Sequence, residues 1–142
     1  MTNLPPDTEL EFELQELYIL CKHWTQDLAF IEDELNFFKN ILKKYEAMGA
    51  QSDQPSKYIQ FSSKIKELAG HIITLKKSVP QYLKLLQPFI NDSKKEMHLD
   101  LILKYNALQT EIQNLFWIIK KLKNELFTYT EIIIEADKLN SL

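Results

Sequence analysis

The sequence predicts an all-α protein, an up-down-up antiparallel bundle of three long helices with coiled-coil-like packing. Three segments repeat apolar residues at alternating steps of three and four, a period that favours a helix and that a strand has no reason to keep. Short polar breaks separate the segments, and short connections make consecutive helices antiparallel neighbours. We therefore expect residues 1–142, of which 45% are hydrophobic, to form one helical-bundle domain.

The first helix is expected over about 8–48. Its apolar line consists of Leu10, Leu14, Leu17, Cys21, Trp24, Leu28, Ile31, Leu35, Phe38, Leu42 and Tyr45. Thr8 and Glu11 have the spacing of a capping box, which places the start of the helix near Thr8. Gly49 is expected to end the helix in the left-handed conformation, and 49–56 is the predicted linker.

The second helix is expected over about 57–90. Its apolar line consists of Tyr58, Phe61, Ile65, Leu68, Ile72, Leu75, Val79, Tyr82, Leu86 and Phe89. Pro80 and Pro88 lie inside it, and each internal proline costs a helix about 3 kcal/mol. Because the apolar period continues through Pro80 without a shift, we expect one helix that is kinked or split there, so that four helices could be counted.

The third helix is expected over about 93–140, opened by a capping box of Ser93 and Glu96. Its apolar line consists of Leu101, Tyr105, Leu108, Ile112, Leu115, Ile119, Leu122, Leu126, Tyr129, Ile133 and Ala136. A simple register places a residue of the third helix beside the residue of the first helix that is about 80 positions earlier. Residues 130–142 then project beyond the first helix, and either the linker or a second chain must cover their apolar side chains.

The chain has more apolar residues than a three-helix core uses. The candidate interface residues are Phe30, Phe37, Ile41, Phe116, Trp117, Ile118, Ile132, Ile133 and Ile134. These residues either wrap around the rim of the core or form a second packing face, used for homodimerisation or for docking a helix of another protein. The register places Trp117 near Phe37.

The sequence argues against catalytic, cofactor and metal sites. The three histidines, His23, His71 and His98, fall at different levels of the bundle, so they cannot share one ion. Cys21 and His23 diverge because they lie two residues apart on a helix, and Cys21 is expected to be a buried small hydrophobe. With two glycines in the whole chain there is no glycine-rich phosphate loop, so we expect a protein that is not an enzyme.

Charge and hydropathy also bear on partners. The formal net charge is −3 and arginine is absent, which argues against nucleic acid as a partner. Lysines gather towards the linker end and acidic residues towards 7–16, a polarity that favours an antiparallel dimer. Residues 1–6 carry no basic region and no segment is long and apolar enough to span a membrane, so a cytoplasmic protein is expected.

These features predict a protein–protein interaction or scaffold module that self-associates through its surplus apolar helix faces. One alternative is an amphipathic bundle that opens onto a lipid surface. The other is a metal-binding helical-bundle enzyme built on the histidines, against which the register argues. Liposome flotation and elemental analysis separate these alternatives from a self-associating bundle.

The first helix carries a partial family resemblance. Its string Trp24, Leu28, Ile31, Glu34, Leu35, Phe38 and Leu42 resembles the opening helix of a Bacteroidetes-type helical-bundle family of unknown function. The resemblance covers a third of the chain and implies no activity. The up-down-up plan with a tryptophan in the first helix is also similar to spectrin-type repeats in architecture, and architecture alone does not imply function.

Overall fold

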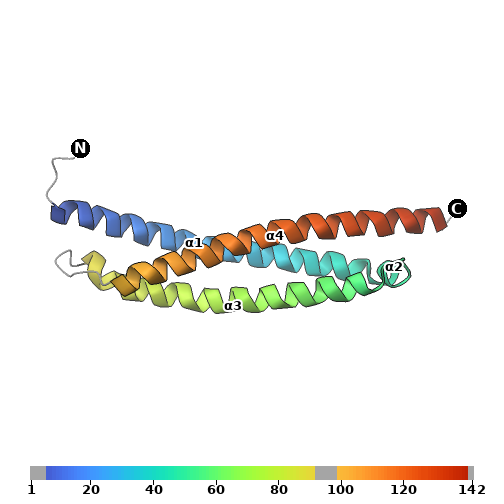
Figure 1. Ribbon diagram of the computed structural model, residues 1–142, viewed down its shortest axis with the longest axis horizontal. Coiled ribbons are helices and arrows are strands. Elements are labelled where there is room, and N and C mark those ends of the chain that lie inside the picture. Colours follow the sequence, from blue (N-terminus) through green and yellow to red (C-terminus); the bar gives the residue numbers. More distant parts are fainter. Residues whose placement is uncertain (1–5, 92–98, 141–142) are drawn as a thin grey trace. The chain divides into compact units, whose positions relative to one another are not determined.

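The computed structural model describes residues 6–91 and 99–140, and over these ranges the chain is helical without a β-strand. Within these described ranges four helices follow one another: α1 (Pro6–Lys44), α2 (Glu46–Ala50), α3 (Ser56–Asn91) and α4 (Leu99–Asn140) (Figure 1). The prediction of an all-α protein is confirmed. The predicted capping box of Ser93 and Glu96 lies outside the described residues, as does His98.

The first predicted helix differs from α1 at both ends. α1 begins at Pro6, two residues before the expected start, and proline is well suited to a first helical position because its missing N–H has no partner there in any case. It ends at Lys44, and after a turn at Tyr45 the short helix α2 follows. The region predicted as the end of one helix is therefore a break and a second helix.

Gly49 has a different role from the one expected. It lies inside α2, and no glycine among the described residues has a positive φ, so the prediction of a left-handed helix end at Gly49 is wrong. Instead, the hydroxyl of Tyr129 occupies the space that a β-carbon at this position would need. The Ser52 hydroxyl donates a hydrogen bond to the Gly49 carbonyl at 2.6 Å and so satisfies one acceptor at the end of α2.

α3 runs without a break through both of its internal prolines, so the helix is not split at Pro80. Pro80 and Pro88 are exposed, whereas Val79 and Tyr82 on either side of Pro80 are buried. The burial of this apolar line offsets the backbone hydrogen bond that each proline removes. In the turn before Pro80, the Ser78 hydroxyl donates to the Thr74 carbonyl at 3.0 Å, a contact that often accompanies a bend.

The chain divides into two compact units. Unit 1 comprises Met1–Ala29 and Ile73–Gln113, and unit 2 comprises Phe30–Ile72 and Asn114–Leu142. The core of unit 1 consists of Cys21, Trp24, Leu28, Leu75, Val79, Tyr82, Leu86, Leu101 and Ile112. The core of unit 2 consists of Ile31, Leu35, Phe38, Leu42, Phe61, Ile65, Leu68, Ile72, Leu115, Ile119, Leu122, Leu126, Tyr129 and Ile133. Every one of these side chains belongs to the three predicted apolar lines.

In unit 1, two aromatic contacts join the helices. The Tyr82 hydroxyl donates to the Leu101 carbonyl at 2.8 Å and so ties α3 to the first described turn of α4. The ring of Trp24 on α1 stacks on that of Tyr105 on α4 with centroids 5.2 Å apart. Both contacts place a polar tip or an aromatic face against a neighbouring helix, as large amphipathic side chains do at the edge of a core.

In unit 2, a cluster of aromatic rings joins α1, α3 and α4. Phe127 packs edge-on against Phe37 and Phe38, with centroids 6.4 Å away in each case. Phe61 on α3 lies against Tyr129 on α4 at 5.3 Å. In this unit α1 and α4 run in the same direction. Glu34 on α1 pairs with Lys123 on α4, and four residues later on both helices Phe38 packs against Phe127.

Candidate interaction surface

The structure distributes the predicted interface residues between surface and core. Phe30, Phe37, Phe116, Trp117 and Ile132 are exposed, Ile41, Ile118 and Ile134 are half-buried, and Ile133 is buried. Trp117 exposes 64% of its surface, an unusual amount for the largest apolar side chain. The exposed members on α1 and α4 of unit 2, Phe30, Phe37, Phe116 and Trp117, are called the aromatic face below.

A groove of about 410 Å³ runs between α1 and α4 at this face. Its apolar lining consists of Phe30, Ile31, Phe116, Trp117 and Ile119, and its charged lining consists of Glu34, Lys120 and Lys123. The Lys123 Nζ lies 3.6 Å from a Glu34 carboxylate oxygen and 5.9 Å from the centroid of the Phe127 ring. The groove therefore combines apolar and charged side chains, as protein interfaces do.

Trp117 also borders a second groove, of about 350 Å³, between α3 and α4. Lys57, Lys64 and Lys121 line this groove together with one carboxylate, that of Glu125. The Lys121 Nζ stands 5.4 Å from the centroid of the Trp117 ring, a cation–π contact at the surface. The indole is thus a ridge between two hollows, with lysines on both sides.

The register of unit 2 differs from the expected one. Glu34 pairs with Lys123, and Phe38 packs on Phe127, an offset of 89 positions in each case (123 minus 34, 127 minus 38). The expected offset of about 80 is therefore wrong in this unit. Trp117 shares its groove with Phe30, and Phe37 instead contacts Phe127.

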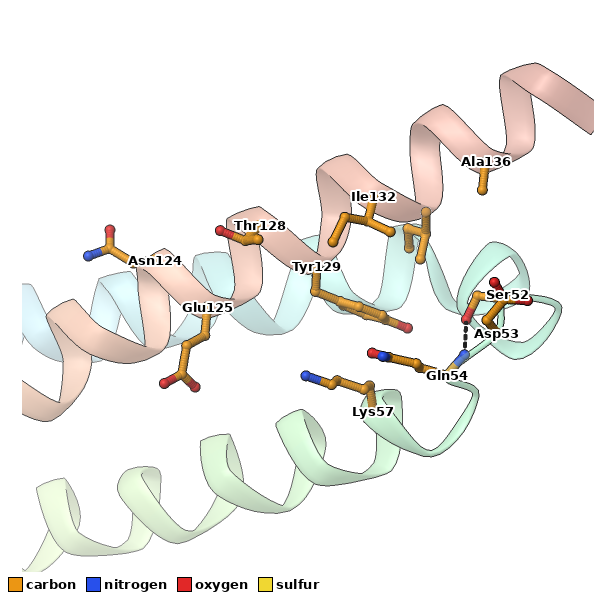
Figure 2. Close-up of a pocket in the computed structure, with 11 residues that line it drawn as sticks. Ser52, Asp53, Gln54, Lys57, Asn124, Glu125, Thr128, Tyr129, Ile132 and Ala136 are labelled. Carbon is orange, nitrogen blue, oxygen red and sulfur yellow. Dashed lines mark hydrogen bonds between the residues drawn. The ribbon is translucent and has the colours of Figure 1, made fainter.

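The linker forms a third hollow, of about 430 Å³, with the beginning of α3 and the end of α4 (Figure 2). Ile132, Ile133 and Ala136 line it from α4, while Ser52 and Asp53 line it from the linker. Of the two covers considered for the end of the third helix, the linker is the one that adjoins Ile133, which is 3% exposed. Ile132 in contrast remains 63% exposed.

Tyr129 is the most deeply placed polar side chain of this hollow. Figure 2 shows its ring directed from α4 towards the linker, above the side chains of Gln54 and Lys57. Its hydroxyl is buried and has no hydrogen-bond partner of acceptable geometry among the described residues. Burial raises the pKa of Tyr129, and the nearby Ser52 hydroxyl, which donates to the Gly49 carbonyl, partly lowers it.

Unit 1 contains the only cysteine of the chain. Cys21 is fully buried, as expected from its place in the first apolar line, and its thiol is free. Burial raises the pKa of Cys21 from 9.0 to about 12. Burial, and secondarily the neighbouring Cys21, also raises the pKa of Tyr82. At neutral pH both groups are therefore neutral and serve as packing groups.

Alkaline pH is expected to destabilise the protein through this cluster. Folding raises the pKa of Cys21 because the buried thiol favours its neutral form. The thiol therefore contributes fully to the free energy of unfolding below pH 9, and this contribution is lost as the pH rises towards about 12. A Cys21→Ala variant should lose less free energy of unfolding over this range than the native protein, although Tyr82 still titrates. Urea denaturation at a series of pH values measures both slopes, and equal slopes would contradict the assignment.

Two findings on the described residues concern metal ions and membranes. Among residues 6–91 and 99–140, no group of three or more His, Cys, Asp and Glu side chains could hold a metal ion. In the same described part of the chain, no helix is long and apolar enough to cross a membrane. No family model matches the chain, and no curated protein or solved structure is similar to it.

Sequence reasoning missed two parts of this surface. Phe127 joins Phe37 and Phe38, although it lies outside the three apolar lines and was not among the surplus residues. Its place directly after the core residue Leu126 was the available signal, since a large ring beside a core position reaches the neighbouring helix. No pattern in the sequence predicts the hollow at the linker, because the hollow depends on how the linker packs against α4.

Proposed function

We propose that this chain is a non-enzymatic protein–protein interaction or scaffold module that self-associates through the aromatic face of unit 2. The observation that supports this most strongly is the exposure of Trp117 between two grooves. Tryptophan is enriched among the residues that dominate binding energy, where it fills a pocket on the partner. Four exposed aromatic residues on α1 and α4 of one unit are more apolar surface than folding alone requires.

The proposal includes the arrangement and location of the chain. The chain forms an up-down-up antiparallel bundle of three long helices, counting α2 as part of the first connection. The contacts of Phe38 with Phe127 and of Phe61 with Tyr129 support three-helix packing in unit 2. The module acts in the cytoplasm, and the buried, protonated thiol of Cys21 is consistent with a reducing compartment.

Local charge, and not the net charge of a whole unit, must steer the association. Unit 2 contains ten lysines and ten carboxylate side chains in its sequence, so the lysine-rich end has no excess of positive charge. Lys120, Lys121 and Lys123 nevertheless surround the aromatic face. A partner surface with carboxylates at the matching positions would complement them.

Replacing Trp117 with lysine is expected to convert the dimer to a monomer while most helicity is kept. The substitution places a charge within the apolar contact, where truncation of an anchor residue alone costs about 2 kcal/mol or more of binding free energy. Light scattering coupled to size exclusion measures the mass, and circular dichroism measures the helicity.

The matched control is Ile59→Lys. Ile59 is 65% exposed in unit 2 and lies on α3 outside the two grooves that flank Trp117. The control should leave the mass unchanged. A dimer that survives Trp117→Lys shows that the aromatic face is not the interface, and a native protein that is monomeric at every concentration contradicts self-association itself.

A further inference from the structure

The exposed side of α4 in unit 2 carries a row of residues that is symmetric along the helix. The row, called the outer stripe below, consists of Trp117, Lys121, Asn124, Thr128, Ile132, Glu135 and Leu139. Successive members are four, three, four, four, three and four residues apart. These steps keep all seven on one face of the helix, and all seven are exposed.

The residues of the outer stripe have the same spacing on both sides of Thr128. An antiparallel second copy of α4, centred on this threonine, therefore places Trp117 opposite Leu139 and Lys121 opposite Glu135. Both apolar end residues are well exposed, Trp117 at 64% and Leu139 at 70%. Each would be covered by the other, which removes two pairs of large apolar side chains from water.

The charges of the outer stripe select the direction of pairing. In the antiparallel arrangement each lysine of the stripe meets a glutamate, and the two-fold symmetry produces this pair twice. In a parallel arrangement Lys121 would meet its own copy and Glu135 would meet its own copy, and like charges that face each other are destabilising. Asn124 then lies opposite Ile132 and Thr128 lies at the two-fold axis.

We propose that two copies of this chain associate through antiparallel pairing of their α4 outer stripes, with the two-fold axis at Thr128 and Lys121 paired with Glu135 across the interface. The proposal rests on the proposed function, since it specifies the partner and the register of a self-association in which Trp117 is the shared anchor, and of the aromatic face only Trp117 lies in the outer stripe. The paired segment of 117–139 is about 33 Å long, because each residue adds about 1.5 Å along a helix. This length extends from the aromatic face to the last turns of α4.

The test is a charge exchange followed by light scattering at low salt. Lys121→Glu and Glu135→Lys should each weaken dimerisation by about tenfold, because each creates two like-charge pairs in the dimer. The double variant restores both pairs with reversed sign, and its dimerisation should return to within about threefold of the native value. Lys104→Glu, an exposed site on α4 within unit 1, is the control for charge change and should have no effect.

A cross-link locates the axis independently. A Thr128→Cys variant should form a disulfide-linked dimer on mild oxidation, because the two introduced thiols meet at the symmetry axis. Lys121→Cys should not, since its two copies would lie about 21 Å apart along the helices. The native Cys21 does not interfere because it is fully buried.

The outcomes separate the register from the proposed function. If Trp117→Lys gives a monomer but the double charge variant is no better than the single ones, self-association holds and this register is overturned. The register is equally overturned if the Thr128→Cys dimer forms no disulfide while its mass is that of a dimer. A native protein that remains monomeric overturns both proposals, whereas rescue together with cross-linking supports both.

Discussion

Replacing Ile133 with aspartate is expected to lower the free energy of unfolding by about 4–5 kcal/mol, among the largest effects that single substitutions produce. Ile133 is 3% exposed and lies in the core of unit 2 beside Tyr129 and the linker. The change removes buried apolar surface and places a carboxylate in the core of unit 2, and the burial of a charge is the costlier of the two. Urea denaturation of dilute protein, followed by circular dichroism, measures the change.

The matched control is Ile132→Asp, one residue earlier on the same helix. Ile132 is 63% exposed, so the new carboxylate stays in water, and the free energy of unfolding should change by no more than about 0.5 kcal/mol. Any loss of dimer mass in this variant concerns association and not folding. Similar destabilisation in the two variants would contradict the burial of Ile133 within its own chain.

The destabilisation by Ile133→Asp should depend on pH. Burial favours the neutral form of the new carboxyl group and raises its pKa in the folded protein. When folding raises the pKa of a carboxyl group, the free energy of unfolding falls as the pH rises above the pKa of that group in the unfolded protein. For aspartate this unfolded pKa is about 3.9. The difference between variant and native protein should therefore shrink as the pH falls towards about 4, and a constant difference would indicate that only the lost apolar contacts matter.

Replacing Phe38 with alanine is expected to lower the free energy of unfolding by about 3–5 kcal/mol. The Phe38 ring is fully buried and packs against Phe127, so its removal leaves a cavity between α1 and α4 of unit 2. Side chains in a dense core refill such a cavity only in part, which is why the cost exceeds that of the lost apolar surface alone.

The neighbouring Phe37→Ala is the matched control, with the same chemical change at an adjacent position. Phe37 also contacts Phe127, yet it is 52% exposed and leaves no closed cavity. The Phe37→Ala substitution should lower the free energy of unfolding by about 1 kcal/mol, which is the range for the loss of an exposed aromatic pair. Equilibrium denaturation compares the two variants, and a larger effect at Phe37 would reverse the assignment of core and surface on α1.

Much of the fold was predictable because the apolar period is local information. A helix repeats its core-facing positions every three or four residues, so the positions of Leu28, Leu75 and Leu122 in their lines sufficed to predict their burial. The expected bounds of the second helix, about 57–90, lie within one residue of those of α3, Ser56–Asn91. These inferences needed no knowledge of which helix lies beside which.

The predictions that failed concern contacts between segments far apart in sequence. Gly49 was given a conformational role because a glycine near a helix end commonly has one. Its role is steric, and the responsible group, the Tyr129 hydroxyl, is far away in sequence. At Pro80 the sequence left a kinked and a split helix open, and the split is excluded because α3 runs through the proline in one piece.

At the candidate interaction surface, too, the local pattern was predictable and the contacts between distant segments were not. The sequence identified Trp117 and Phe30 as surplus apolar residues, because each lies off its core line. It could not decide that they share one groove, since a change of nine positions in register exchanges Phe37 for Phe30 as the neighbour of Trp117. Of the three consecutive isoleucines, the period alone indicated that Ile133 belongs to the core line.

The sequence by itself determined the three long helices and the face that each one buries, because helical period, proline and turn residues act over a few neighbouring positions. Only the tertiary structure decided the register of α4 on α1 in unit 2, the close approach of Tyr129 to Gly49 and the hollow at the linker. The register is set by how aromatic rings such as Phe127 interlock across helices. That packing depends on the shapes of side chains from distant segments, which a periodic pattern does not encode.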